Sequence, residues 1–265
     1  MMSTPTGHSS PSREQLLLLD FDGTVCLGDD PVLHYAAQVD ALLADRGAAE
    51  RDDGGTAEGD AGVRDVVAEA LAAGDLHVPE LSPGVSVQDG YQLVQRLGLA
   101  RGLSVEEAGV AFRAGREALL TAGLHRSDVH APAGLAALLD EVRETAAVVL
   151  ITNSPAAAFA PWLEVLGLTG AFDAVVNDAG KPAGLPAALE EARRRAGAEH
   201  VAETQVLSIG DIWENDLAPV AARGGTTVLI DRFGAGVGTP DHRVPDLAAA
   251  APILRHWAAA PHSDV

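Results

Sequence analysis

The sequence predicts an α/β fold, in which a parallel sheet carries helices on both faces and a helical block interrupts the chain after the first strand. In the second half of the chain, short apolar runs alternate with segments of helical periodicity, a pattern typical of repeated strand-helix-strand units. Between the first apolar run and this alternation, about residues 25–128 show helical periodicity and little that resembles a strand. These two observations together predict the fold class.

The first strand is predicted over residues 16–19, where four consecutive leucines form an apolar run typical of a strand buried on both faces of a parallel sheet. Asp20 and Asp22 follow directly, before Gly23 and Thr24. Side chains two positions apart on a strand point to the same side. Two carboxylates held that close repel each other, which indicates a bound cation or a catalytic role. An ordinary Asp-Gly turn also fits these residues taken alone.

The segment after this strand is predicted to form a helical block. Helical periodicity is expected over residues 32–46, 63–73, 85–97 and 105–122. Residues 47–62 are rich in Gly and acidic residues and are expected to form a mobile surface loop, as residues 1–14 are expected to form a disordered leader. A helical block directly after a strand-borne site suggests a lid. Its arginines Arg96, Arg113 and Arg116 could reach a substrate anion, but they are expected on solvated helix faces.

Polar residues follow the predicted strands of the second half. Strands are expected over residues 147–152, 174–176, 206–209 and 226–230, with helices over residues 132–144, 155–166, 185–196 and 217–222. Thr152 and Asn153 end the first of these strands, Lys181 lies past the second, and Asp211 and Asp216 follow the third. Each has an ordinary interpretation as a cap, turn or surface charge. Ligands of parallel sheets bind at the carboxyl ends of strands, so the whole set predicts a site there.

Lys181 is the only lysine of the chain, and the other seventeen of its 18 basic residues are arginines. A composition that avoids lysine elsewhere indicates that arginine does not serve at this position. An ammonium group is a compact point charge that can touch a phosphoryl oxygen and a carboxylate together.

The overall charge excludes several classes of partner. Asp and Glu number 38 and the formal net charge is −20, which repels nucleic acid and anionic membranes. The single cysteine, Cys26, allows no internal disulfide. The N-terminus lacks the pattern of a signal peptide, and no apolar run approaches the ~20 residues that span a bilayer. We therefore expect a soluble cytoplasmic protein that binds a small molecule, with an oligomeric state that the sequence does not predict.

The polar motifs together resemble those of haloacid dehalogenase (HAD) superfamily hydrolases. The four motifs of that family match, in order, Asp20-x-Asp22-Gly23-Thr24, Thr152, Lys181 and Gly210-Asp211-x4-Asp216. The resemblance implies a Rossmann-like parallel core formed by residues 1–24 and 129–265. It also implies a mostly α-helical cap over residues 25–128, inserted after the first motif.

The resemblance further implies a Mg²⁺-dependent phosphatase that hydrolyses a small soluble phosphomonoester through an aspartyl-phosphate. Asp20 would be the nucleophile, and Asp22 would protonate the leaving oxygen and later deprotonate the attacking water. The implied ligands of the Mg²⁺ are the Asp20 carboxylate, the Asp22 backbone carbonyl, Asp211 and, directly or through water, Asp216.

The remaining matched residues would bind the substrate. Thr152 and Lys181 would hold the phosphoryl oxygens and stabilise their charge. Thr24 and Asn153 are expected to contribute to substrate binding.

Four other functions occur on a scaffold of this kind, and the site residues argue against three of them here. A phosphomutase keeps all four motifs and stays open, although its usual cap lysine is missing. A dehalogenase has no use for the carboxylates of Asp22, Asp211 and Asp216, and a phosphonatase needs a cap lysine that this chain lacks. A catalytically silent binding or regulatory protein is expected to have lost at least one charged site residue, and here all are present. The identity of the substrate is not predicted.

Overall fold

The computed structural model describes residues 13–49, 61–82 and 84–260. Within them a six-stranded sheet has the order β3-β2-β1-β4-β5-β6, and every neighbouring pair of strands is parallel. The strands are β1 (Gln15–Leu19), β2 (Ala146–Ile151), β3 (Ala174–Val176), β4 (Val206–Gly210), β5 (Thr226–Ile230) and β6 (His242–Val244). Most of the predicted leader and of the predicted loop over residues 47–62 lies outside the described residues.

Strand β1 lies at the centre of the sheet, between β2 and β4. Its leucines alternate between the two faces, as strand geometry requires. Leu17 and Leu19 belong to one buried cluster and Leu16 and Leu18 to the other. Full burial of a leucine side chain contributes roughly 1.5–3 kcal/mol to the stability of the fold. The four leucines therefore stabilise the packing on both faces of the sheet. The prediction of a strand buried on both faces is confirmed.

Helices cover both faces of the sheet, which confirms the predicted α/β class. Those that pack with Leu17 and Leu19 are α5 (Leu135–Val142), α6 (Ala160–Val165) and α9 (Leu247–Ala258). Those that pack on the opposite face are α7 (Leu185–Ala196) and α8 (Ala218–Ala221).

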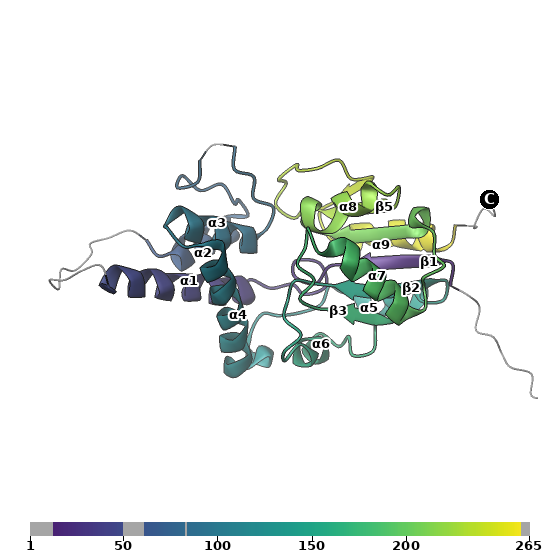
Figure 1. Ribbon diagram of the computed structural model, residues 1–265, viewed down its shortest axis with the longest axis horizontal. Coiled ribbons are helices and arrows are strands. Elements are labelled where there is room, and N and C mark those ends of the chain that lie inside the picture. The colour runs from purple at the N-terminus through teal and green to yellow at the C-terminus, as the bar shows by residue number, and fades with distance from the viewer. Residues whose placement is uncertain (1–12, 50–60, 83, 261–265) are drawn as a thin grey trace, which may run out of the picture.

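Four further helices gather at one end of the molecule, away from the sheet (Figure 1). They are α1 (Asp30–Ala49), α2 (Val63–Ala73), α3 (Gly90–Ala100) and α4 (Val105–Ala122), and they share a buried cluster of their own. Helix α4 packs closely against α1 at Gly115, where an added Cβ would lie only 2.8 Å from the Cα of Tyr35. Helices form in all four segments where helical periodicity predicted them. We refer to α1–α4 and the turns between them as the helical block.

The two connections between the sheet and the helical block run side by side. Leu27 and His130 form an antiparallel bridge with backbone hydrogen bonds of 2.9 and 3.1 Å. The backbone N–H groups of Asp29 and Asp30 donate to the Asp128 carboxylate at 2.7 and 3.0 Å. These contacts lie near the predicted boundaries at residues 25 and 128, and we propose that the chain divides there into a core and a cap.

Four elements differ clearly from the predictions. Helix α3 begins at Gly90, five residues later than predicted, because the Asp89 side chain accepts from the N–H of Gln92 at 2.7 Å and caps the helix there. Helix α6 begins at Ala160 because the preceding turn includes Ala158 with a φ of 56°, which is not helical. Strand β6 and helix α9 were not predicted.

Among the described residues, no helix is long and apolar enough to cross a membrane.

Candidate active site

A cavity of about 220 Å³ lies at the carboxyl ends of the strands, beside the point where the strand order reverses at β1. One wall consists of residues that follow β1, β2, β3 and β4, and the opposite wall consists of residues from α1, α3 and α4. The predicted site residues that line it are Asp20, Asp22, Thr152, Asn153, Lys181 and Asp216. Parallel register explains why residues so distant in sequence meet, since Leu19 pairs with Leu150 on one side and Ile209 on the other.

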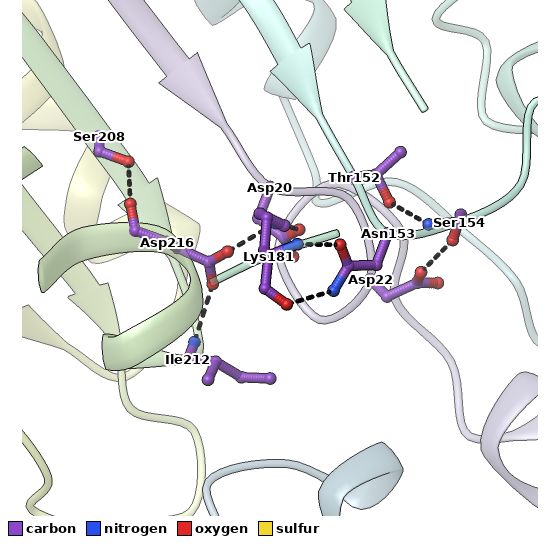
Figure 2. A network of polar contacts seen from close by, with 9 residues as sticks. All are labelled: Asp20, Asp22, Thr152, Asn153, Ser154, Lys181, Ser208, Ile212 and Asp216. Carbon is purple, nitrogen blue, oxygen red and sulfur yellow. Dashed lines mark hydrogen bonds and ion pairs between the residues drawn. The ribbon is translucent and has the colours of Figure 1, made fainter. Parts of the chain in front are cut away.

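Lys181 joins two of the predicted carboxylates. Its Nζ lies 2.5 Å from Oδ1 of Asp20 and 2.6 Å from Oδ1 of Asp216, and its side chain is 3% exposed (Figure 2). Burial alone would lower the pKa of Lys181, but the two carboxylates raise it above its ordinary value. The lysine therefore keeps its charge and holds both aspartates in place.

Asp211 completes a group of three buried carboxylates with Asp20 and Asp216, whose oxygens lie within 4.8 Å of one another. Its Oδ1 is buried and makes no hydrogen bond within the described part of the chain. Two glycines permit this close packing, because a Cβ at Gly23 would lie 2.0 Å from Oδ2 of Asp211 and one at Gly210 would lie 2.5 Å from Cβ of Asp216.

This group of carboxylates fits a divalent cation. Burial raises the pKa of Asp20 to about 8, an effect that Lys181 opposes and Asp216 and Asp22 reinforce. Burial, with Asp89 and Asp20 nearby, also raises the pKa of Asp211 well above its ordinary value. A cation beside these groups would favour their ionised forms, and an all-oxygen ligand set suits Mg²⁺. The residues present are therefore compatible with the predicted Mg²⁺.

Asp22 points away from these three carboxylates and accepts hydrogen bonds from three donors. Ser154 Oγ donates to Oδ2 at 2.6 Å, and Tyr91 Oη and Arg116 Nη1 donate to Oδ1 at 3.1 and 2.9 Å. Burial and the nearby Asp22 carboxylate raise the pKa of Tyr91 above its ordinary value, so its hydroxyl keeps the proton that it donates. The Asp22 carboxylate is thus fixed from both the sheet side and the helical block.

Arg116 is the clearest difference between the predicted and the observed site. It was expected on a solvated helix face, but its side chain is 4% exposed, so that prediction is wrong. Its guanidinium lies 3.9 Å from the ring centroid of Trp162 on α6, besides its ion pair with Asp22. Arg96 and Arg113 are exposed, as predicted.

Residues after β2 shape the edge of the cavity. Thr152 accepts on its Oγ1 from the Ser154 N–H at 3.0 Å. The Asn153 amide holds the backbone of Lys181, with Oδ1 accepting from its N–H at 2.7 Å and Nδ2 donating to its carbonyl at 3.2 Å (Figure 2). Thr24 is fully buried outside the cavity lining, and its hydroxyl makes no hydrogen bond within the described residues. Their roles in substrate binding stay predictions.

Sequence reasoning did not foresee the contributions of Tyr91, Asp89, Ser154 and Arg116. For Arg116 a signal existed, since it falls on the buried stripe of α4 with Ala108, Ala111, Gly115 and Leu119, at the spacing of one helix face. For Asp89 the signal was its position as a helix cap before Gly90. Ser154 follows Thr152 and Asn153 at the end of a predicted strand, which places it near the site, whereas Tyr91 carried no comparable signal.

Comparison with known proteins gives structural neighbours only. No family model and no curated protein matches the sequence. A haloacid dehalogenase-like family hydrolase from Xanthomonas campestris matches with a TM-score of 0.51 and 17% identity over 93% of each chain. A putative phosphoglycolate phosphatase from Lactobacillus plantarum matches with a TM-score of 0.55 and 15% identity, over 91% of this chain and 99% of that one.

A third neighbour is a putative HAD-hydrolase from Bacillus subtilis described as bound to magnesium. It matches with a TM-score of 0.52 and 17% identity, over 91% of this chain and 99% of that one. Likeness at these identities establishes a common fold.

Proposed function

From the haloacid dehalogenase-like fold that this chain has, we propose that it is a Mg²⁺-dependent phosphatase that hydrolyses a small phosphomonoester through an aspartyl-phosphate. One observation carries the proposal: the buried carboxylates of Asp20, Asp211 and Asp216 lie together, Lys181 contacts two of them, and the group borders the cavity directly beside Asp22. A nucleophile, a cation site, a fixed positive charge and a second carboxyl group are the parts that this reaction needs.

In the proposed first step, a carboxylate oxygen of Asp20 attacks phosphorus, and the bond between phosphorus and the ester oxygen breaks. Asp22 donates a proton to that oxygen, so the alcohol leaves neutral. Lys181 Nζ, already 2.5 Å from Asp20, neutralises charge on the phosphoryl oxygens, as does the Thr152 hydroxyl by hydrogen bonding. When bound, Mg²⁺ supplies further electrostatic stabilisation of the phosphoryl oxygens.

In the proposed second step, water attacks phosphorus of the aspartyl-phosphate and Asp22 accepts its proton. Inorganic phosphate leaves and the Asp20 carboxylate is restored. Asp22 needs a stable position for both proton transfers, and its three donors on two sides of the cavity provide one. Arg116 and Tyr91 thus act as positioning residues through which the helical block contacts the reacting groups.

Removal of divalent cations is expected to lower p-nitrophenyl phosphate turnover by about two orders of magnitude or more, since a metal ion in such a site contributes several kcal/mol. Mg²⁺ should restore the rate and raise the melting temperature of the wild-type protein. Asp211→Asn should abolish that rise, whereas Asp140→Asn, at an exposed position on α5, should keep it. Unchanged turnover in excess chelator would contradict the proposal. Measuring inorganic phosphate also distinguishes a phosphatase from a phosphomutase, which returns the phosphoryl group to a substrate.

Asp22→Asn is expected to reduce kcat most for substrates with poor leaving groups, because general acid catalysis typically contributes about 10²–10⁴ in rate. Alkyl phosphates should lose about that factor and p-nitrophenyl phosphate much less, since a nitrophenolate leaves without a proton. Comparing both substrates on the same preparation separates catalysis from folding, because unfolded protein loses both activities equally. Equal losses in a variant with wild-type melting behaviour would contradict the role of Asp22.

A further inference from the structure

The alcohol part of a bound substrate faces the helical block. In phosphoryl transfer the attacking and leaving oxygens lie roughly in line on opposite sides of phosphorus. With Asp20 attacking from the end of β1, the leaving oxygen points away from the sheet. The opposite wall is formed by residues of α1, α3 and α4 and by the cap residue Asp89. The chemistry of that wall therefore selects the alcohol.

This wall carries no positive charge. Among the described residues that line the cavity, Lys181 is the only cation, and its contacts are to Asp20 and Asp216. The helical block contributes a carboxyl instead, Asp89, which is 6% exposed. Burial raises the pKa of Asp89 to about 7, and neither of its protonation states offers a positive charge.

Two arginines of α4 lie outside the cavity lining. Arg116 donates to Asp22 and stacks on Trp162, and it does not line the cavity. Arg113 is exposed beside Gly109, whose Cβ, if present, would lie 3.5 Å from Nη1 of Arg113. An anionic group on the alcohol would therefore lie near Asp89 with no cation of this wall's lining to pair with it, and an unpaired charge in a cavity is unfavourable.

The other residues of the wall suit carbon and hydroxyl groups. The rings of Tyr35, Tyr91 and Phe112 pack together with centroids 5.7–6.5 Å apart and form an apolar surface. Gln92 and Gln95 add amides, which both donate and accept. The Gln95 side chain is half-buried and has no hydrogen-bond partner within the described part of the chain. A volume of about 220 Å³ holds a handful of water molecules at ~30 Å³ each, and so a small substrate.

We propose that the substrate is the phosphate ester of a small uncharged alcohol that carries hydroxyl groups, and that the site discriminates against alcohols bearing a carboxylate or a second phosphate. The proposal rests on the phosphatase function proposed above. The net charge of −20 acts in the same direction at long range, because it repels a more highly charged anion.

The direct test compares 2-hydroxyethyl phosphate with phosphoglycolate, which share a two-carbon chain and differ in a terminal hydroxyl or carboxylate. We expect kcat/KM, measured with Mg²⁺ by phosphate release, to favour the hydroxyethyl ester by at least about tenfold. An equal or larger value for phosphoglycolate would overturn the specificity proposal. p-Nitrophenyl phosphate is measured in parallel, since failure to hydrolyse any of the three esters would overturn the phosphatase function itself.

A charge placed on the wall tests its role separately. Gln95→Arg adds a cation to the cavity lining, and Gln38→Arg adds the same charge on α1 outside that lining. Gln95→Arg is expected to raise the ratio of kcat/KM for phosphoglycolate over hydroxyethyl phosphate by about tenfold or more, because it supplies the missing partner. Gln38→Arg should leave the ratio near the wild-type value.

A second variant changes the charge of the same wall independently, so the test still holds if Gln95→Arg misfolds. Asp89→Asn keeps a side chain that can cap α3 and should shift the ratio in the same direction by a smaller factor. An unchanged ratio in both cavity variants, each with wild-type melting behaviour, would overturn the proposal, and so would an equal gain in Gln38→Arg.

Discussion

Asp20→Asn is expected to reduce phosphate release by about four to six orders of magnitude, the scale seen when a covalent nucleophile is removed. An amide cannot attack phosphorus, and the other residues of the cavity cannot supply a replacement at the end of β1. The substitution is nearly isosteric. Burial disfavours the ionised form of Asp20, so an uncharged amide at this position does not raise the cost of burying the side chain.

The fold of this variant is expected to persist. Lys181 also contacts Asp216, at 2.6 Å, and this ion pair does not depend on the Asp20 carboxylate. The melting temperature should therefore stay within a few degrees of the wild type, and Asp140→Asn provides a matched control at an exposed aspartate. Turnover above about 1% of the wild type by Asp20→Asn, with mass spectrometry excluding deamidation back to aspartate, would contradict the role of Asp20 as nucleophile.

The sheet and the position of its site could be predicted because both depend on local patterns. Four consecutive leucines identify a strand buried on both faces, and the helix-strand alternation identifies a parallel sheet. The carboxyl ends of its strands then converge by geometry alone. Asp20, Thr152 and Lys181 therefore line one cavity although they lie far apart in the sequence.

The contribution of the helical block could not be predicted in the same way. Arg116 meets Asp22 across 94 positions of sequence, and its burial depends on Trp162 of another helix. A charged residue on an amphipathic helix is usually solvated, and only the tertiary partners reverse that expectation. Tyr91 is similar, because its hydroxyl reaches Asp22 from a helix whose start depends on the Asp89 cap.

Lys181 follows a strand predicted from local pattern, but its contacts to Asp20 and Asp216 come from distant parts of the chain. Its replacement by an uncharged residue is expected to lower both turnover and stability strongly. Lys181→Met leaves the carboxylates of Asp20 and Asp216 buried without their shared cation. Breaking such a buried pair typically costs about 3–5 kcal/mol of unfolding free energy. Phosphate release should fall by about 10³-fold or more, because a preorganised charge at the phosphoryl group is lost.

Lys181→Arg separates the two effects. It keeps the positive charge, so most of the unfolding free energy should remain. The planar guanidinium is larger than an ammonium and distributes its charge over a fixed fork, whereas Nζ is confined to a point between two carboxylates at 2.5 and 2.6 Å, with the lysine backbone held by Asn153. Turnover should therefore fall by about 10²-fold while stability changes little.

Urea unfolding and p-nitrophenyl phosphate turnover, measured on both Lys181 variants, test this separation. Arg255→Met removes the cation of the exposed pair with Glu141, in which both side chains are 51% exposed, and serves as the control, since exposed ion pairs contribute little. Wild-type turnover by Lys181→Arg would show that any cation suffices at this position. Wild-type unfolding free energy in Lys181→Met would show instead that the two aspartates need no cation from the chain to stay buried together.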